Sequence, residues 1–185
     1  MAKFTYGSLP RVYKAKGFLP GQITKYFGPK YVAVGFLDSA NQVQVEFGEF
    51  CEVNAGDQYA YEVLPVSATT TAGELAVRVR DVVGAPSLDN GIIETSKKWV
   101  PLSLFLGTNG QKGKITAILG EQGTTPAVGG QVYVGTGATV ATVAGVVYTT
   151  NVGTECIEAT GWTFAGTKFA PTTSGNYVVE VEYAG

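Results

Sequence analysis

Tyr177-Val-Val-Glu-Val-Glu-Tyr183, close to the end of the chain, is the stretch that decides the fold class. Its tyrosines and odd-numbered valines take one face, while Val178, Glu180 and Glu182 take the other, which is the period-two pattern of a β-strand with one wet face. Residues 42–47 and 74–80 alternate in the same way. We therefore expect a strand at each of the three segments, the last one paired into a sheet at the chain end.

Composition extends this expectation to the whole chain of 185 residues. Valine and threonine number 45 against ten leucines, and branched Cβ atoms favour pleated surfaces. The longest stretch without glycine or proline is residues 36–47, so long helices cannot fit. We predict an all-β fold, a barrel or sandwich. Its further strands are expected at residues 31–36, 58–64, 99–106, 114–119, 131–134, 140–148 and 161–165.

The first 29 residues differ from the rest. Pro10, Pro20 and Pro29 recur without sustained alternation, so residues 1–29 are predicted to form an extended arm on a β-rich body of residues 30–185. A split of the body into two subdomains near residue 120 is an open alternative. Six basic and no acidic residues precede Asp38, whereas seven basic and fifteen acidic residues occupy the chain from there on. Such asymmetry favours an arm that meets an acidic surface, nucleic acid or a neighbouring copy.

The motifs of common chemistries are missing from the sequence. There is no histidine, no G-x-S-x-G elbow and no complete phosphate-binding loop, and Cys51 and Cys156 stand outside metal-ligand spacings and are expected to be small buried apolar residues. We therefore expect no enzyme, no cofactor and no metal. A hydrolase with paired carboxylates stays as an alternative, with the densest acidic group as its candidate: Glu46, Glu49, Glu52 and Asp57. We favour the interpretation of this group as a solvated strand face and loop.

The basic arm has the residues for binding a partner. Aromatic side chains interleave with its lysines, which suits either base stacking or anchoring in protein pockets. The sequence pI near 5.2 opposes phosphate binding by the body, so we do not expect nucleic acid as the partner. The sequence contains no run of 18 apolar residues, so we expect no membrane span. The N-terminus lacks a secretory signal, so we expect synthesis in the cytoplasm. The candidate partner-binding residues are Arg11, Tyr13, Lys14, Lys16, Phe18, Leu19, Lys25, Tyr26 and Phe27. For the aromatic ones, packing onto the body is the alternative.

Several segments together resemble a known family. These are the opening Lys16–Gln22, the strand Gly73–Arg80, the Val-Tyr-Val strand in Gly130–Gly135, and the closing segments Ala159–Ala165 and Gly175–Glu182. They resemble the structural cement, or capsid decoration, proteins of tailed bacteriophages. The resemblance implies a small protein, often oligomeric, that binds the outer face of an assembled capsid and braces joints between major capsid protein subunits. It also implies localisation on the virion exterior. We also expect neighbouring copies of the chain as partners, in a trimer or ring. The sequence does not indicate the number of subunits.

Two further interpretations stay open beside that resemblance. One is another virion or surface component, such as a head-fibre or tail domain or a glycan-binding, adhesin-like module. The other is the carboxylate hydrolase. The tryptophans, Trp99 and Trp162, are expected in the core in preference to an interface.

Overall fold

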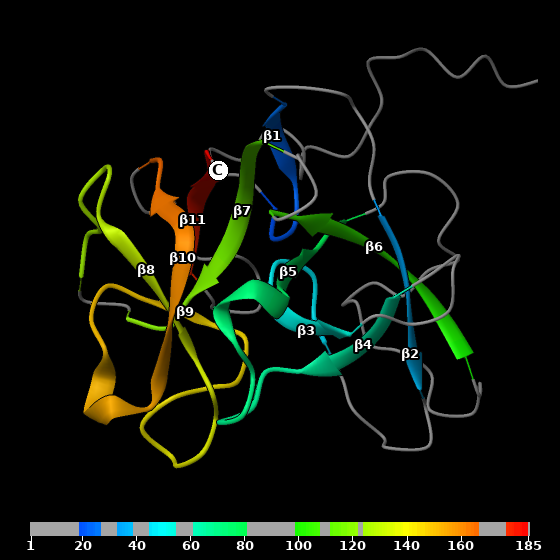
Figure 1. Ribbon diagram of the computed structural model, residues 1–185. Helices are drawn as coiled ribbons and strands as arrows, with labels where there is room; N and C mark the ends of the chain where they lie inside the picture. The colour runs from blue at the N-terminus through cyan, green and yellow to red at the C-terminus, as the bar shows by residue number, and fades with distance from the viewer. Residues whose placement is uncertain are drawn as a thin grey trace, which may run out of the picture.

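The structure, a computed structural model, describes residues 19–26, 33–38, 45–54, 61–80, 99–107, 112–121, 124–166 and 177–184. Its elements are strands and two short 3-10 turns, Ala72–Glu74 and Val152–Thr154, so the predicted all-β class is confirmed. Figure 1 shows two β-structures side by side, with β8, β10 and β11 on one side and β2, β4 and β6 on the other.

The first β-structure is a closed barrel. Its strands are β2 (Ala33–Asp38), β3 (Phe50–Asn54), β4 (Tyr61–Pro65), β5 (Leu75–Arg78) and β6 (Trp99–Leu106). They pair around the barrel in the order β2-β4-β3-β5-β6, and β2 closes it by pairing parallel to β4 and antiparallel to β6. Closure leaves none of these strands as a free edge.

The second β-structure is a six-stranded sheet. It contains β1 (Ile23–Tyr26), β7 (Gly113–Leu119), β8 (Gln131–Gly135), β9 (Val147–Tyr148), β10 (Cys156–Phe164) and β11 (Tyr177–Tyr183). The order is β1-β7-β11-β10-β8-β9, and β9 also pairs with β7 through Val147 and Leu119, so the sheet curls back on itself. The chain passes from barrel to sheet between β6 and β7. The predicted boundaries at residues 29 and 120 stay predictions.

One hydrophobic core joins the barrel to the sheet. Trp162 of β10 is 1% exposed, and its ring lies 5.0 Å from that of Phe50 and 5.8 Å from that of Phe105, both barrel residues. Tyr183 of β11 packs on the same indole at 5.3 Å. A second cluster, which includes Cys51, Val63 and Leu104, is formed mainly by residues of the barrel strands. Trp162 is therefore a core residue, as expected; the side chain of Trp99 lies outside the description.

The alternation of β5 was misleading, because both of its faces are buried. Leu75 and Val77 point into the core shared with the sheet, and Ala76 belongs to the barrel cluster. Arg78, expected on a wet face, is 5% exposed. The prediction of one solvated face is wrong here because the strand is shared between two cores.

Two predicted strands are wrong, in whole or in part. Of residues 42–47, the described part forms no strand and leads into a turn at Gly48, which has φ +81°. Of residues 140–148, Val147–Tyr148 is strand and the rest is a loop. The sequence pattern also missed β1, β3 and the first half of β10, Cys156–Thr160.

Candidate functional site

The described part of the predicted arm is fastened to the middle of β7. Residues 19–22, here called the arm root, bond to Thr116, whose hydroxyl donates to the Leu19 carbonyl at 2.6 Å and accepts from the Gln22 amide at 2.9 Å. The Gly21 amide donates to the Thr116 carbonyl at 2.9 Å. Thr116 is fully buried, and a buried hydrogen-bonding group is costly to leave unpaired. These bonds therefore fix where the arm leaves the body.

A second attachment joins the arm root to the end of β5. The Arg80 amide donates to the Gly21 carbonyl at 2.8 Å, and its Nε donates to the Pro20 carbonyl at 3.0 Å. Gly21 has φ +74°, and a Cβ there would lie 2.6 Å from the Arg78 carbonyl oxygen. Both the left-handed conformation and the close approach require glycine.

Phe47 lies between two arginines beside this attachment. The guanidinium carbons of Arg78 and Arg80 are 4.3 Å and 4.4 Å from the centre of its ring. Arg78 also donates from Nη1 to the Val45 carbonyl. Cation–π contacts of this kind contribute about 0.5–2 kcal/mol each. They hold the segment before β3 against β5, next to the arm root.

Glu49 has an unusual environment in the same region. Its Oε2 accepts a 2.6 Å hydrogen bond from the Glu46 amide. Burial raises the pKa of the Glu49 carboxyl to about 7, an effect that the Glu46 hydrogen bond and the charge of Arg78 oppose and the Glu46 charge reinforces. The prediction of a solvated face is wrong for Glu49, because the loop before β3 folds onto the junction of barrel and sheet. Desolvation of the charged form is the dominant cause.

The other candidate acidic residues are placed differently. Glu52 accepts hydrogen bonds from the hydroxyl of Thr70 and, at 3.3 Å, from the side-chain amide of Asn54. Glu46 and Glu52 are half-buried, and Asp57 lies outside the described residues. The carboxylates of Glu49 and Glu52 accept hydrogen bonds that hold loops and strand ends in place.

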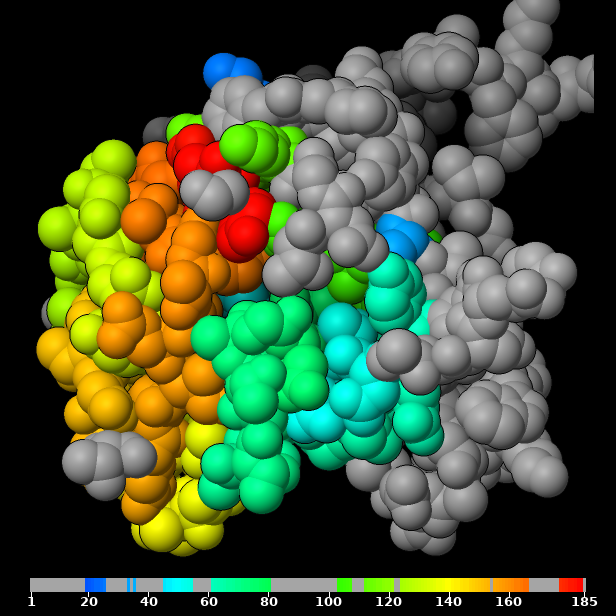
Figure 2. Space-filling model, in the orientation of Figure 1, coloured from blue at the N-terminus to red at the C-terminus, as the bar shows by residue number. Residues whose placement is uncertain are grey.

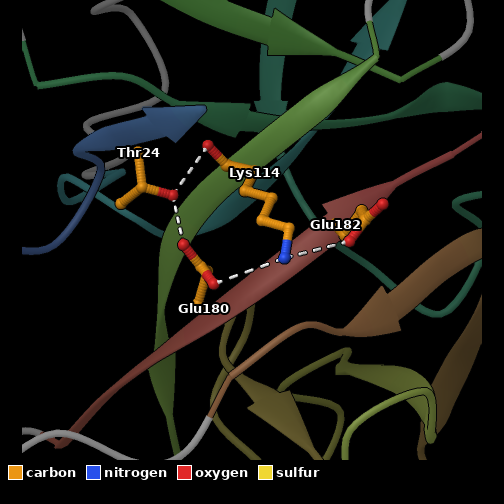
Figure 3. Close-up of polar contacts among 4 residues, drawn as sticks. All are labelled: Thr24, Lys114, Glu180 and Glu182. Atoms are coloured by element: carbon orange, nitrogen blue, oxygen red, sulfur yellow. Dashed lines mark hydrogen bonds and ion pairs between the residues drawn. The ribbon is translucent and has the colours of Figure 1, made fainter. Parts of the chain in front are cut away.

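A polar cluster links β1, the strand within the predicted arm, to β7 and β11 (Figure 3). Lys114 Nζ lies 3.8 Å from Glu180 and 3.4 Å from Glu182. The hydroxyl of Thr24 in β1 contacts the Glu180 carboxylate and the Lys114 carbonyl, the latter at 3.3 Å. These side chains are partly exposed, so each ion pair contributes little. The cluster nonetheless gives β1 side-chain contacts in addition to its backbone pairing with β7.

Three of the predicted partner-binding residues fall within the described chain. Leu19 is half-buried at the arm root, Lys25 is exposed on β1, and Tyr26 ends β1. The remaining six lie outside the described residues: Arg11, Tyr13, Lys14, Lys16, Phe18 and Phe27. Their role in binding stays a prediction.

Sequence reasoning missed the residues that hold the arm root. Thr116 looked like any other strand threonine, and Arg78 and Arg80 looked like solvated strand positions. The available signals were the Pro20-Gly21 and Phe47-Gly48 pairs, because glycine in such pairs marks backbone turns and close approaches. The sequence does not reveal that these two turns meet, with a Cβ on Gly48 only 2.7 Å from the Gly21 nitrogen.

The cysteines are both free thiols. Cys51 is buried in the barrel cluster, as expected, and burial raises the pKa of its thiol to about 12. Cys156 is half-buried at the start of β10. Within the described ranges, no three His, Cys, Asp or Glu residues gather as a metal site would need. No helix in this part of the chain has the length and apolar character to cross a membrane.

Comparison with known proteins gives a structural likeness. No protein-family model matches the sequence, and no curated protein matches it either. The fold is similar to that of a chain in the solved structure "The capsid of Myoviridae Phage XM1", with a TM-score of 0.58 and 16% identity. The likeness covers 96% of this chain and 96% of the other, so the two chains are of about equal length. At this identity the likeness shows a shared fold.

Proposed function

We propose that this protein is a structural component of a phage virion. In the proposal, it binds the outer surface of the assembled capsid and stabilises contacts between major capsid protein subunits. The observation that carries it is the end-to-end likeness to a chain of a phage capsid. Because the likeness covers nearly all of both chains, it involves the combination of barrel and sheet and not one small β-unit alone.

Binding of this kind stabilises a capsid by linkage. A protein that binds the assembled lattice and not the free subunits shifts the equilibrium toward the lattice. Many copies act on one closed shell, so modest affinity per copy is sufficient. An all-β body with a shared core suits this role, because a rigid body loses little conformational entropy on binding.

The arm is the proposed contact element. Arg11, Lys14, Lys16 and Lys25 would lie at the rim of the interface, and the aromatic and leucine residues of the arm, Tyr13, Phe18, Leu19, Tyr26 and Phe27, would anchor in pockets of the major capsid protein. The fixed arm root supports this assignment. Its bonds to Thr116 and Arg80 hold the start of the described chain at one place on the body. Because the arm root is fixed in this way, a capsid that binds the arm would also hold the body close to its surface.

The test is binding of purified protein to capsids assembled without it, measured by co-sedimentation and by particle occupancy in electron microscopy. We expect the full chain to bind, and a truncation of residues 1–18, which spares the arm root and β1, to lose most of that binding. Failure of the full chain to attach to any capsid of its own phage would refute the proposal. Full occupancy by the truncated chain would remove the arm from it.

A matched pair of variants tests the rim charges. Arg11, Lys14 and Lys16 changed to Gln remove three positive charges from the arm, and Lys97, Lys98 and Lys112 changed to Gln remove three from the body. Three rim charges of about 0.5 kcal/mol each predict roughly tenfold weaker binding for the arm variant. The body variant should bind as the wild type does. Equal weakening of both would mean that net charge, and not the arm, drives attachment.

A further inference from the structure

The turn of residues 46–49, here called the junction turn, meets both halves of the molecule. The Gly48 amide donates to the carbonyl of Arg78 in the barrel at 3.0 Å, and the amide of Ile118 in the sheet donates to the Gly48 carbonyl at 3.1 Å. Figure 2 shows the cyan atoms of this part of the chain, residues 45–54, beside the turquoise atoms of the segment from β4 to β5, in the middle of the viewed face. A change in the junction turn therefore reaches both β-structures.

The junction turn also packs against the arm root. A Cβ on Gly48 would lie 2.7 Å from the Gly21 nitrogen and 2.9 Å from the Cβ of Pro20, so the two turns are in close contact. Gly48 has φ +81°, a left-handed conformation that glycine adopts without strain. The two turns bond to the same short segment, because Arg78 accepts from Gly48 and Arg80 donates to Gly21. The position of the arm root therefore depends on the shape of the junction turn.

Glu49 holds the junction turn in that shape. Its Oε2 accepts a hydrogen bond from the Glu46 amide at 2.6 Å, and its own amide donates to the Glu46 carbonyl at 3.2 Å. The Arg78 amide donates to the Glu49 carbonyl at 3.0 Å, which joins the end of the turn to β5. The carboxyl group thus closes a ring of bonds across the turn. Rotation of this side chain out to solvent would break the Oε2 bond and open the turn.

The negative charge of an ionised Glu49 has little compensation at this place. Arg78, the cation that faces it, donates from Nη1 to the Val45 carbonyl and lies over the ring of Phe47. No ion pair between described residues includes Glu49. The charge of Glu46 opposes a second negative charge beside it. A charge on this half-buried carboxyl is therefore more stable in water than in the closed turn.

The other elements packed on the junction turn bring no charge to Glu49. On its own strand the neighbouring titratable group is the Cys51 thiol, which burial keeps neutral by raising its pKa to about 12. The loop of residues 136–146 has no charged side chain and approaches through Gly145, where a Cβ would lie 3.2 Å from the Cβ of Glu49. The arm root and residues 115–119 of β7 have no charged side chain either. Desolvation therefore dominates, and it raises the pKa of the Glu49 carboxyl from 4.5 to about 7.

We propose that the junction turn is a pH-sensitive switch on the arm root, which is held while Glu49 is protonated and loosened when Glu49 is ionised. Release of the arm root and hydration of the Glu49 carboxyl are one event in this proposal. Ionisation favours the hydrated form, so the attachment is strongest below about pH 4.5 and weakens as the pH rises through 7. The switch acts in the free protein, so its test is independent of the capsid contact proposed above.

The test is amide hydrogen exchange of the full chain, followed by NMR at pH 5, 6, 7 and 8, with each rate corrected for the intrinsic effect of pH. The reporters are the Gly21 and Thr116 amides, which donate to the carbonyls of Thr116 and Gln22, and the reference is the β7–β11 ladder of the same sample. From pH 5 to pH 8 the protection of the reporters relative to the ladder should fall about tenfold or more in the wild type. Glu49→Gln should abolish this fall. Glu62→Gln, at an exposed glutamate of β4, is the matched control and should retain it.

Each result decides the proposal. Equal relative protection at pH 5 and pH 8 in the wild type would overturn it, because Glu49 would then titrate without moving the arm root. The same fall in Glu49→Gln as in the wild type would also overturn it, because another group would then be titrating. Glu46→Gln is a second variant, which keeps the amide that bonds to Glu49 but removes a neighbouring negative charge. Its fall should be smaller than that of the wild type, and an equal or larger fall would contradict the switch.

Discussion

Replacing Glu49 by glutamine is expected to remove most of the change in stability between pH 5 and pH 8. The folded-state pKa of Glu49 is about 7 against an ordinary value of 4.5. The folded protein therefore prefers the protonated carboxyl. Its contribution to stability is fully present below about pH 4.5 and is lost as the pH rises through 7.

The magnitude follows from that difference in pKa. From 4.5 to 7 is 2.5 pKa units, which at about 1.36 kcal/mol per unit gives roughly 3.4 kcal/mol as an upper bound. Glu49 is half-buried, so solvent screening reduces the expected value to about 2 kcal/mol. Glutamine resembles the neutral acid and keeps an oxygen that can accept from the Glu46 amide. At pH 8 the Glu49→Gln variant should be more stable than the wild type by about this amount, and at pH 5 the difference should fall to below about 1 kcal/mol.

The assay is urea unfolding of both proteins at pH 5, 6, 7 and 8, with the free energy of unfolding plotted against pH. Glu62→Gln is the matched control, because Glu62 is an exposed glutamate on β4. Its curve should follow that of the wild type. A Glu49→Gln curve with the slope of the wild type over this range would refute the argument, since the Glu49 carboxyl would then not be the group that titrates.

Three further predictions concern the packing. Thr116→Val keeps the shape of the side chain but removes the hydrogen bonds to Leu19 and Gln22. It should lower the free energy of unfolding in urea by about 1–3 kcal/mol and make the arm root more susceptible to limited proteolysis. Unchanged cleavage would contradict the role of Thr116. Trp162→Ala should cost about 3–5 kcal/mol and lower the melting temperature as one transition, whereas two separate transitions would show that barrel and sheet are independent. Lys114→Met removes a cation between two partly exposed glutamates and should change stability by less than about 1 kcal/mol at low salt, with a larger loss showing that this cluster matters more than its exposure indicates.

Strands with a clear signal in the sequence were predicted well. Trp99–Leu106 was located with its bounds, and Tyr177–Tyr183 has the predicted faces. In the second strand, however, Val178 on the glutamate face is also fully buried. Alternation of apolar and polar residues indicates which residues lie on opposite faces of a strand, and turn residues indicate where the strand ends. Neither reports what covers the second face of a sheet.

The errors arose where distant segments decide the structure. Alternating Val45 and Phe47 resembled a strand, but Phe47 is held between Arg78 and Arg80, more than thirty residues later in the chain. Residues 140–146 are rich in branched side chains, yet Thr139 and Thr142 bond to the loop backbone and compete with strand pairing. The position of the arm root was equally hidden, because it depends on Thr116, about a hundred residues away in sequence.

The two attachments of the arm root have a mechanical consequence. Thr116 belongs to the sheet, and Arg80 lies two residues beyond the end of barrel strand β5, so a pull on the chain at Leu19 loads both halves of the molecule at once. The load then reaches the indole of Trp162, where the two halves are packed together. Tension on the arm is thereby shared across the whole body. Detaching the arm root requires its hydrogen bonds to Thr116 and to Arg80 to break together.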